Sequence, residues 1–268
     1  MSENGFTLQV VQDVRYYSCR AFDQIPRLRH GFSTRSGGRH GGRSFNLSET
    51  SWDSPEHVRD NQHHLLTAIK LEKAHLITLR QIHSNRVYII EDNPVRWNRP
   101  EGDALITKME NVALAVQIAD CIPVLIVDPD HFAIAAVHSG WRGTLGGILF
   151  QTIRKMQQAL GSDPARLLIA TGPGIRSCCF EVGLEVAGLF DEQYPKHSLT
   201  EPVRGRPQKR LLDLFKALDI QMNLAGVPVG NRYDLTACTC CRADEFFSYR
   251  AEGAAAGRMM AVIGLSPG

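Results

Sequence analysis

Three residues of the kinds that bind transition metals follow apolar segments in the middle of the chain. Cys121 comes after an apolar run at 112–118, and His138 comes directly after another at 132–137. His83 follows a third such run at 74–79. Imidazole nitrogen and thiolate sulfur are ligands that zinc prefers, and a catalytic zinc keeps three protein ligands and one open position. Because a sheet holds its strand ends rigidly, these three residues make a candidate zinc site.

The spacing of these residues leaves other roles open. Separations of 38 and 17 residues match no zinc-finger pattern. Cys121 could instead be a buried thiol beside a histidine that caps a helix. It could also be a nucleophile with His138 as its base, which would need no metal.

Five further cysteines lie in two groups near the carboxyl-terminal third of the chain. Cys178 and Cys179 are adjacent, and Cys238, Cys240 and Cys241 form the second group. The two groups together could build a structural zinc site, but neither contains a CxxC pair. Small buried thiols near a strand end are the simpler interpretation.

Two arginine-containing segments could bind an anion. The stretch RSGGRHGGR at 35–43 combines glycines, which free backbone N–H groups, with three arginines that begin at Arg35. A solvated loop is the alternative interpretation of this composition. Arg250 ends the segment FFSYR, where it could hold phosphate or pair with Glu245 or Glu252.

The middle of the chain is rich in short apolar or alternating runs that predict strands. Because they follow one another closely, they leave no room for crossover helices, which favours antiparallel pairing. We expect these strands at 74–79, 87–91, 103–107, 112–118, 124–127 and 132–137.

Helical patterns flank this strand-rich region. Ser54 and Pro55 are the N-cap and first residue of a predicted helix. A second apolar stripe predicts a helix at 144–160 that Gly161 ends. Further helices are expected at 182–193 and 211–224, a strand at 166–171, a solvated loop at 203–210, and a last strand within 257–265. Without repeats or a long linker, we expect a single domain over residues 1–268.

Composition narrows the class of protein. The chain has 30 basic and 28 acidic residues, a net charge of +2, which gives no reason to expect a nucleic-acid partner. No run approaches the roughly 18 apolar residues of a membrane span, and no signal peptide is apparent. Seven cysteines are an odd number. We therefore expect a cytoplasmic protein with reduced thiols that needs no membrane.

Seven ordered motifs of the chain resemble the YfiH/laccase-domain family, which is also called the multicopper polyphenol oxidase family. The motifs are HGFSTRSGG (30–38), LRQIHSNRV (79–87), GDALIT (102–107), ADCIPVLIVDP (119–129), AAVHSGWRGT (135–144), GPGIRSCCFEVG (172–183) and FFSYRAEGAAAGRM (246–259).

The resemblance implies a layered α/β/β/α sandwich of α+β class, with mostly antiparallel or mixed sheets. This is a cysteine-hydrolase type of fold shared with the catalytic domain of cytotoxic necrotizing factor. It also implies a metal, usually one zinc ion, on His83, Cys121 and His138. The activities it implies are phosphorolysis of adenosine, inosine, guanosine and methylthioadenosine, and deamination of adenosine.

The family's older label, a copper-dependent polyphenol oxidase or laccase, is less compatible with this sequence. A laccase needs several coppers and many histidine ligands, whereas ten histidines here include no HxH pair. We therefore prefer zinc over copper, with a metal-free Cys/His hydrolase as a further alternative.

The resulting prediction is a zinc-dependent purine nucleoside phosphorylase with adenosine deaminase activity, whose substrates are a purine nucleoside and phosphate. His83, Cys121 and His138 would serve as metal ligands and catalytic centre. Arg35 and Arg250 are the candidate phosphate contacts, and Asn46 and Gln81 the candidate contacts for ribose or base. Asp120 would orient the metal ligands without touching the ion.

Overall fold

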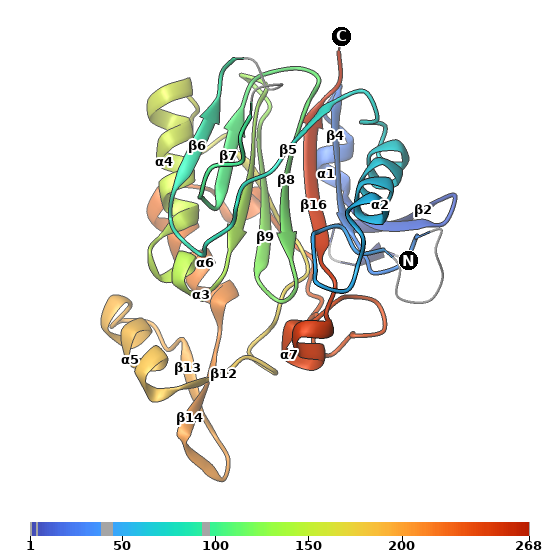
Figure 1. The fold of residues 1–268 in the computed structure, drawn as a ribbon. Helices are drawn as coiled ribbons and strands as arrows, with labels where there is room; N and C mark the ends of the chain where they lie inside the picture. The colour runs from blue at the N-terminus through green and yellow to red at the C-terminus, as the bar shows by residue number, and fades with distance from the viewer. Residues whose placement is uncertain (1, 4, 39–44, 93–96, 268) are drawn as a thin grey trace.

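The apolar runs of the chain assemble into two large sheets that pack face to face (Figure 1). The computed structural model describes all residues except 1, 4, 39–44, 93–96 and 268. The seven-stranded sheet has the order β1 (Ser2–Glu3), β2 (Phe6–Val11), β3 (Val14–Cys19), β4 (Leu28–Ser33), β16 (Met259–Leu265), β8 (Val112–Ile118) and β5 (His75–Ile77). The six-stranded sheet has the order β15 (Arg232–Asp234), β11 (Leu168–Thr171), β9 (Ile122–Asp128), β10 (Ala133–Ser139), β7 (Ala104–Thr107) and β6 (Val87–Ile90).

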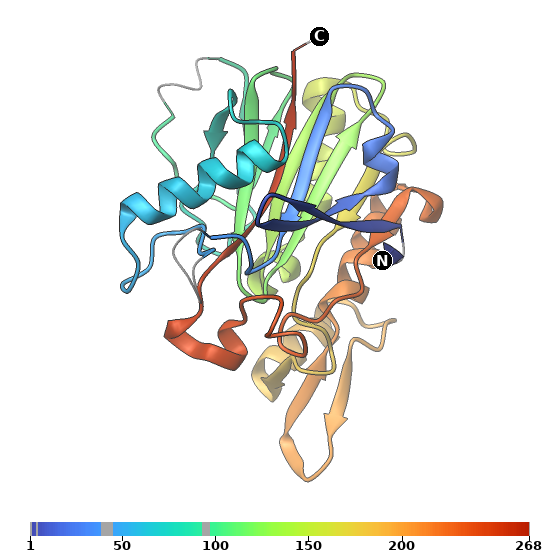
Figure 2. The same cartoon turned by 90° about the vertical axis from the view of Figure 1, so that its right-hand side faces the viewer.

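Helices cover the outer face of each large sheet. Figure 2 shows α2 (Pro55–Ala68) lying across the seven-stranded sheet. On the far side of the sandwich, α4 (Ile148–Leu160) and α6 (Leu214–Ala225) pack on the six-stranded sheet. The expected α/β/β/α layering is confirmed. The short helices are α1 (Arg20–Asp23), α3 (Trp141–Leu145), α5 (Leu184–Gln193), α7 (Tyr249–Glu252), and the 3-10 turns η2 (Val229–Asn231) and η3 (Gly253–Ala255).

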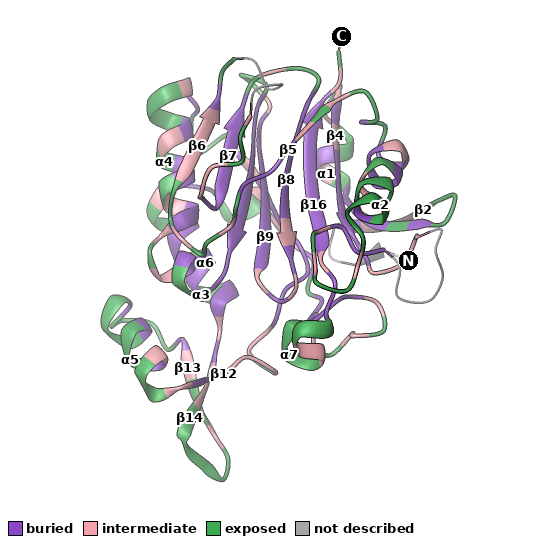
Figure 3. Cartoon of the chain, viewed as in Figure 1, coloured by how far each residue is buried: buried purple, intermediate pink, exposed green. Residues whose placement is uncertain are grey.

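Burial on both faces explains why the central strands read as continuous apolar runs. In β9, Ile122, Val124 and Ile126 pack toward α4 and α6, whereas Leu125 and Val127 join the layer between the two sheets. Figure 3 shows these central strands buried along their length. A third apolar cluster joins α2 to the seven-stranded sheet.

Local signals fixed several of the helix ends. The Ser54 hydroxyl accepts a hydrogen bond from the backbone N–H of His57, and Pro55 begins α2, as expected. Gly161 ends α4 in a left-handed conformation. The predicted helix at 144–160 is wrong at its start, because it is two helices. Gly147, at φ 74°, separates α3 from α4.

Residues 181–212 depart most from the expectation. They form a small three-stranded sheet in the order β12 (Glu181–Gly183), β14 (Arg206–Leu212) and β13 (Thr200–Val203). The predicted loop at 203–210 is wrong, since much of it belongs to β14. The predicted helix at 182–193 is correct only from Leu184 onward, and that at 211–224 only from Leu214. The hairpin formed by β13 and β14 projects away from the sandwich and is largely exposed (Figure 3).

Strand pairing is mostly antiparallel, as expected, with three parallel pairs: β5 with β8, β6 with β7, and β11 with β15. Register brings several strand ends to one end of the sandwich. His138 pairs with Pro123, so β10 finishes where β9 begins. Val137 pairs with Ala104, so β7 also begins there. The β5–β6 and β8–β9 connections, which pass from one large sheet to the other, lie at this same end.

Candidate metal centre

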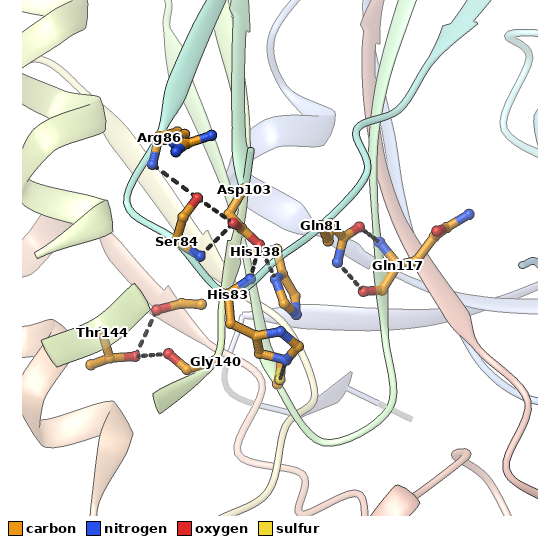
Figure 4. Close-up of polar contacts among 11 residues, drawn as sticks. Gln81, His83, Ser84, Arg86, Asp103, Gln117, His138, Gly140 and Thr144 are labelled. Carbon is orange, nitrogen blue, oxygen red and sulfur yellow. Dashed lines mark hydrogen bonds and ion pairs between the residues drawn. The ribbon is translucent and has the colours of Figure 1, made fainter. Parts of the chain in front are cut away.

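The structure brings His83, Cys121 and His138 together at that end of the sandwich, and Figure 4 shows how the two histidines lie. One ligand atom from each lies within 4.8 Å of the others, and Cys121 Sγ is 3.7 Å from His83 Nε2. Zinc bonds of about 2.0–2.3 Å at tetrahedral angles would place such atoms roughly 3.5 Å apart. The donor types and their separation therefore suit a zinc ion with three protein ligands.

Asp103 orients both histidines. Its Oδ1 lies 2.8 Å from His138 Nδ1 and accepts the backbone N–H of His83 at 3.0 Å. Its Oδ2 accepts the backbone N–H and the hydroxyl of Ser84, each at 2.6 Å. Because a carboxylate only accepts, Nδ1 of His138 carries the proton and Nε2 is left to bind a metal.

Backbone geometry at the centre is unusual. His83 has φ 61° and Asp120 has φ 88°, both in the left-handed region that residues other than glycine rarely adopt. A Cβ atom on Gly140 would lie 2.6 Å from His83 Cδ2 and 3.0 Å from Cys121 Sγ. The chain at Gly140 thus approaches the two ligands more closely than any side chain would allow.

The electrostatics of the centre favour a thiolate. Burial alone would raise the pKa of Cys121, but His138 and His83 more than offset this and lower the pKa to about 6. Burial likewise opposes ionisation of His138, but the Cys121 thiolate and Asp103 raise its pKa to about 9. Near neutral pH Cys121 therefore holds the thiolate form that binds metals, and a metal ion would displace the second proton of His138 from Nε2.

A cavity of about 540 Å³ opens over the three ligands. Its walls bring together both large sheets and the segments around α7. Apart from the ligands, they include the aromatic rings of Phe180 and Tyr249 and four arginines, Arg80, Arg99, Arg250 and Arg258. The cavity thus combines a metal-type centre with apolar and cationic walls.

Two of the predicted substrate contacts do not line this cavity. Arg35 donates to Glu252 Oε1 at 2.8 Å and to the backbone oxygen of Ala243, and its guanidinium lies 4.5 Å from the centre of the Phe247 ring. Residues 39–43 of its predicted anion loop lie outside the described residues. Asn46 is buried, and its Oδ1 accepts the backbone N–H of Arg258. Both side chains hold neighbouring chain segments in place.

The two remaining predicted substrate contacts, Gln81 and Arg250, line the cavity, as does Asp120, which was predicted to orient the metal ligands. Each of the three has partners of its own. Gln81 exchanges two hydrogen bonds of 2.7 Å with the backbone of Gln117, as Figure 4 shows. The Asp120 carboxylate accepts from the Thr239 hydroxyl at 2.7 Å and from the backbone N–H of Arg250 at 2.6 Å. These contacts, and not contacts to the ligand histidines, fix Asp120. Asp103 makes the contacts that we had expected of it.

The guanidinium of Arg250 bridges two carbonyl groups on the opposite wall. It donates to the backbone oxygens of Cys179 at 3.1 Å and Glu181 at 3.0 Å, and it lies 5.5 Å from the centre of the Phe180 ring. Arg258, on the same side, was not predicted as a site residue. Asp103 was also missed, although a carboxylate that opens a buried strand, directly after Gly102, could have indicated it.

The fold and the site together define a class of protein: a layered α/β/β/α sandwich with a Cys/His₂ centre at one end. The sequence profile of the multi-copper polyphenol oxidoreductase laccase family matches residues 29–266, so the chain belongs to this family. The crystal structure of YlmD from Geobacillus stearothermophilus is similar, with a TM-score of 0.88 and 27% identity, over 99% of this chain and 100% of that one.

Two relatives extend the comparison. The chain is 33% identical to a purine nucleoside phosphorylase of Bacteroides thetaiotaomicron, over 96% of this chain and 98% of that protein. It is also 33% identical to adenosine deaminase RL5 from an unknown prokaryotic organism, over 85% of this chain and 90% of that protein. No helix in the described part of the chain is long and apolar enough to cross a membrane.

Proposed function

We propose that the protein is a zinc-dependent enzyme of purine metabolism, a purine nucleoside phosphorylase that also deaminates adenosine. The observation that carries the proposal is the cavity, which places a Cys/His₂ centre beside four arginines. The names of the two relatives give the reactions. Adenosine, inosine, guanosine and methylthioadenosine are the proposed nucleosides.

In this proposal His83, Cys121 and His138 hold the zinc ion. A bound Zn²⁺ supplies Lewis acidity and a nucleophile at neutral pH. Asp103 fixes the tautomer of His138 and the position of His83 through the hydrogen bonds described above. The chain at Gly140 closes one side of the centre, which leaves the cavity side for substrate.

The cavity walls supply the other contacts. In phosphorolysis, phosphate attacks C1′ of the ribose while the bond to the purine base breaks, so an anion must be held next to the sugar. Arg250 and Arg258 are the candidate phosphate contacts, because Arg80 and Arg99 pair with Glu101 and Glu49. Phe180 and Tyr249 offer aromatic surfaces for the base. Gln81 keeps one donor and one acceptor position for ribose or base.

Product analysis tests the proposal. Adenosine and inosine are incubated with the purified protein, with and without phosphate. We expect adenine and hypoxanthine together with ribose 1-phosphate only when phosphate is present, and inosine from adenosine without it. His138→Ala should lose both activities and the zinc ion of this centre, whereas His131→Ala, a distant surface change, should keep both. The proposal fails if neither nucleoside is converted.

Metal analysis separates this function from the two alternatives. A polyphenol oxidase would contain copper and oxidise phenols, and a Cys/His hydrolase would remain active after the metal is removed. Cobalt or zinc restored to the chelated protein should restore nucleoside conversion under the proposed function.

A further inference from the structure

A second group of metal-type ligands lies outside the Cys/His₂ centre. Four sulfur atoms all lie within 4.8 Å of one another, those of Cys178, Cys179, Cys238 and Cys241. Cys241 Sγ is 3.5 Å from Cys178 Sγ and 3.3 Å from Cys179 Sγ. These residues are 62 or 63 positions apart in the sequence, so the fold itself brings the two pairs together.

The separation of the sulfur atoms is that of a tetrathiolate metal site. Four zinc–sulfur bonds of about 2.3 Å at tetrahedral angles place the sulfurs roughly 3.8 Å apart. The distances from Cys241 Sγ to Cys178 Sγ and Cys179 Sγ, 3.5 and 3.3 Å, are close to this value, whereas a disulfide bond would need about 2.05 Å. All four sulfur atoms lie within 4.8 Å of one another, near enough for one ion to bind them together.

Two turns that are bonded to each other carry the four cysteines. Gly174 and Cys238 form a parallel bridge, and the backbone N–H of Thr239 donates to the Gly174 oxygen at 3.2 Å. The backbone N–H of Arg176 points at Cys238 Sγ, at a distance of 3.5 Å. Such N–H···S contacts support the negative charge of a metal-bound thiolate. Cys240, in the same turn as Cys241, is not part of the group.

We propose that Cys178, Cys179, Cys238 and Cys241 bind a second zinc ion with a structural role. Four thiolates fill all four positions of a tetrahedral zinc, which leaves no open position for substrate or water. The site is separate from the Cys/His₂ centre and does not depend on the reaction proposed for it.

The contacts of these turns show what the ion would hold. The Cys179 carbonyl accepts from Arg250, and Phe180, the next residue, lines the 540 Å³ cavity. Thr239, between Cys238 and Cys240, donates to Asp120, which directly precedes the ligand Cys121. Zinc at the four-cysteine group would therefore fix one wall of the cavity by joining the turn at 176–180 to the turn at 238–242.

Zinc content of the purified full-length chain tests the proposal. The wild-type protein should contain about two zinc ions, one for each group of ligands. Cys241→Ser and Cys178→Ser should each contain about one, and so should His138→Ala, which loses the other ion. Cys240→Ser is the matched control, since it removes a thiol from the same turn and should leave the zinc content at the wild-type value.

Cobalt gives a second readout that does not depend on activity or on the cysteine variants folding. Co²⁺ added to chelated His138→Ala protein should show the strong thiolate charge-transfer absorption of a tetrahedral tetrathiolate site. The proposal is overturned if that absorption is absent, if Cys241→Ser and Cys178→Ser keep the wild-type zinc content, or if Cys240→Ser loses as much zinc as they do. A disulfide to Cys241 in the unreduced wild-type protein, found by mass spectrometry, would also overturn it.

Discussion

The Asp103 carboxylate lies 2.8 Å from Nδ1 of His138, and both side chains are buried. The same carboxylate also accepts the backbone N–H of His83, so one residue positions two of the three candidate metal ligands. Burial alone would raise the pKa of Asp103, but the interactions with His138 and Ser84 outweigh it and hold the pKa below its usual range. It is therefore ionised, and acts only as an acceptor, at neutral pH.

Asp103→Asn should weaken zinc binding at the Cys/His₂ centre by about 10- to 100-fold, because an amide cannot accept at both of its terminal atoms. Competition with a chromogenic chelator measures this affinity. Asp128→Asn is a matched control. Asp128 is buried and bonds His131 Nδ1 and two backbone N–H groups in a similar way, but far along β9 from the centre. Equal zinc affinities in the two variants would contradict the role of Asp103.

Gly140→Ala should disturb the centre while leaving the fold intact. The added methyl group would lie 2.6 Å from the His83 ring and 3.0 Å from Cys121 Sγ, so at least one ligand must shift. A shift of about 1 Å at a catalytic group costs roughly 100-fold in rate. The measurements are nucleoside turnover, zinc affinity and the urea midpoint.

The control for this change is Gly188→Ala. A Cβ atom there meets nothing within 4 Å, and the glycine lies inside α5. That variant should gain up to about 1 kcal/mol in free energy of unfolding and keep its turnover. Full zinc affinity in Gly140→Ala would show that the backbone has room at this point.

Arg35→Ala should destabilise the protein without a selective effect on phosphate. The change leaves the Glu252 carboxylate without its ion pair and removes the stacking on Phe247. A lost hydrogen bond to a charged group costs about 1.5–3 kcal/mol in free energy of unfolding. Phosphorolysis and deamination, measured on one preparation, should fall together. A selective loss of phosphorolysis would instead return Arg35 to the phosphate site predicted from the sequence.

Acid should destabilise the fold through His30. This side chain is buried, its Nε2 accepts the backbone N–H of Cys19 at 2.7 Å, and burial lowers its pKa to about 3. The unfolded chain takes up the proton below about pH 6.5, whereas the folded chain does not until about pH 3. The unfolded state therefore binds more protons between these values, and the free energy of unfolding falls as the pH is lowered from about 6.5 toward 3.

The contribution of His30 to the slope of the free energy of unfolding against pH should approach 1.4 kcal/mol for each pH unit. Denaturant titrations at several pH values measure this slope. His30→Gln should reduce this slope, and His63→Gln, on the exposed side of α2, should not. Asp23 Oδ1 lies 3.9 Å from His30 Nε2 and is present in all three proteins, so their comparison isolates the histidine. Identical slopes for wild type and His30→Gln would rule out this origin.

The parts of the fold that could be predicted are those whose pattern comes from burial. The strands that became β8, β9 and β10 are apolar on both faces because layers cover both faces, and their runs marked them almost to the residue. The hairpin of β13 and β14 carries no such pattern. Its residues are mostly exposed, so the sequence at 203–210 predicts a polar loop although most of it belongs to β14. Its neighbours in the sheet, and not its periodicity, determine its conformation.

The same distinction applies to the site. The sequence could predict that His83, Cys121 and His138 lie together, because each follows an apolar run and each belongs to the few residue types that bind metals. The sequence allowed a second metal site at the other cysteines but could not show that they lie together. The two turns that carry them meet only in the folded chain. The sequence could not predict that Arg35 and Asn46 lie outside the cavity, because the partners that hold them, Glu252 and the backbone of Arg258, are more than 200 residues away in the chain. No local spacing predicts such pairs.

The passage of two connections between the large sheets has a mechanical consequence. His83 and Cys121 lie on segments that leave the seven-stranded sheet and enter the six-stranded one, where His138 lies one residue before the end of β10. An ion bound by all three residues would link the two large sheets to each other. A free ion concentration of 100 times the dissociation constant would stabilise the native state by about 2.7 kcal/mol. Because the ion binds the native state, a substitution deep between the sheets, such as Leu125→Ala, would weaken the apparent binding of the ion only once it leaves part of the protein unfolded.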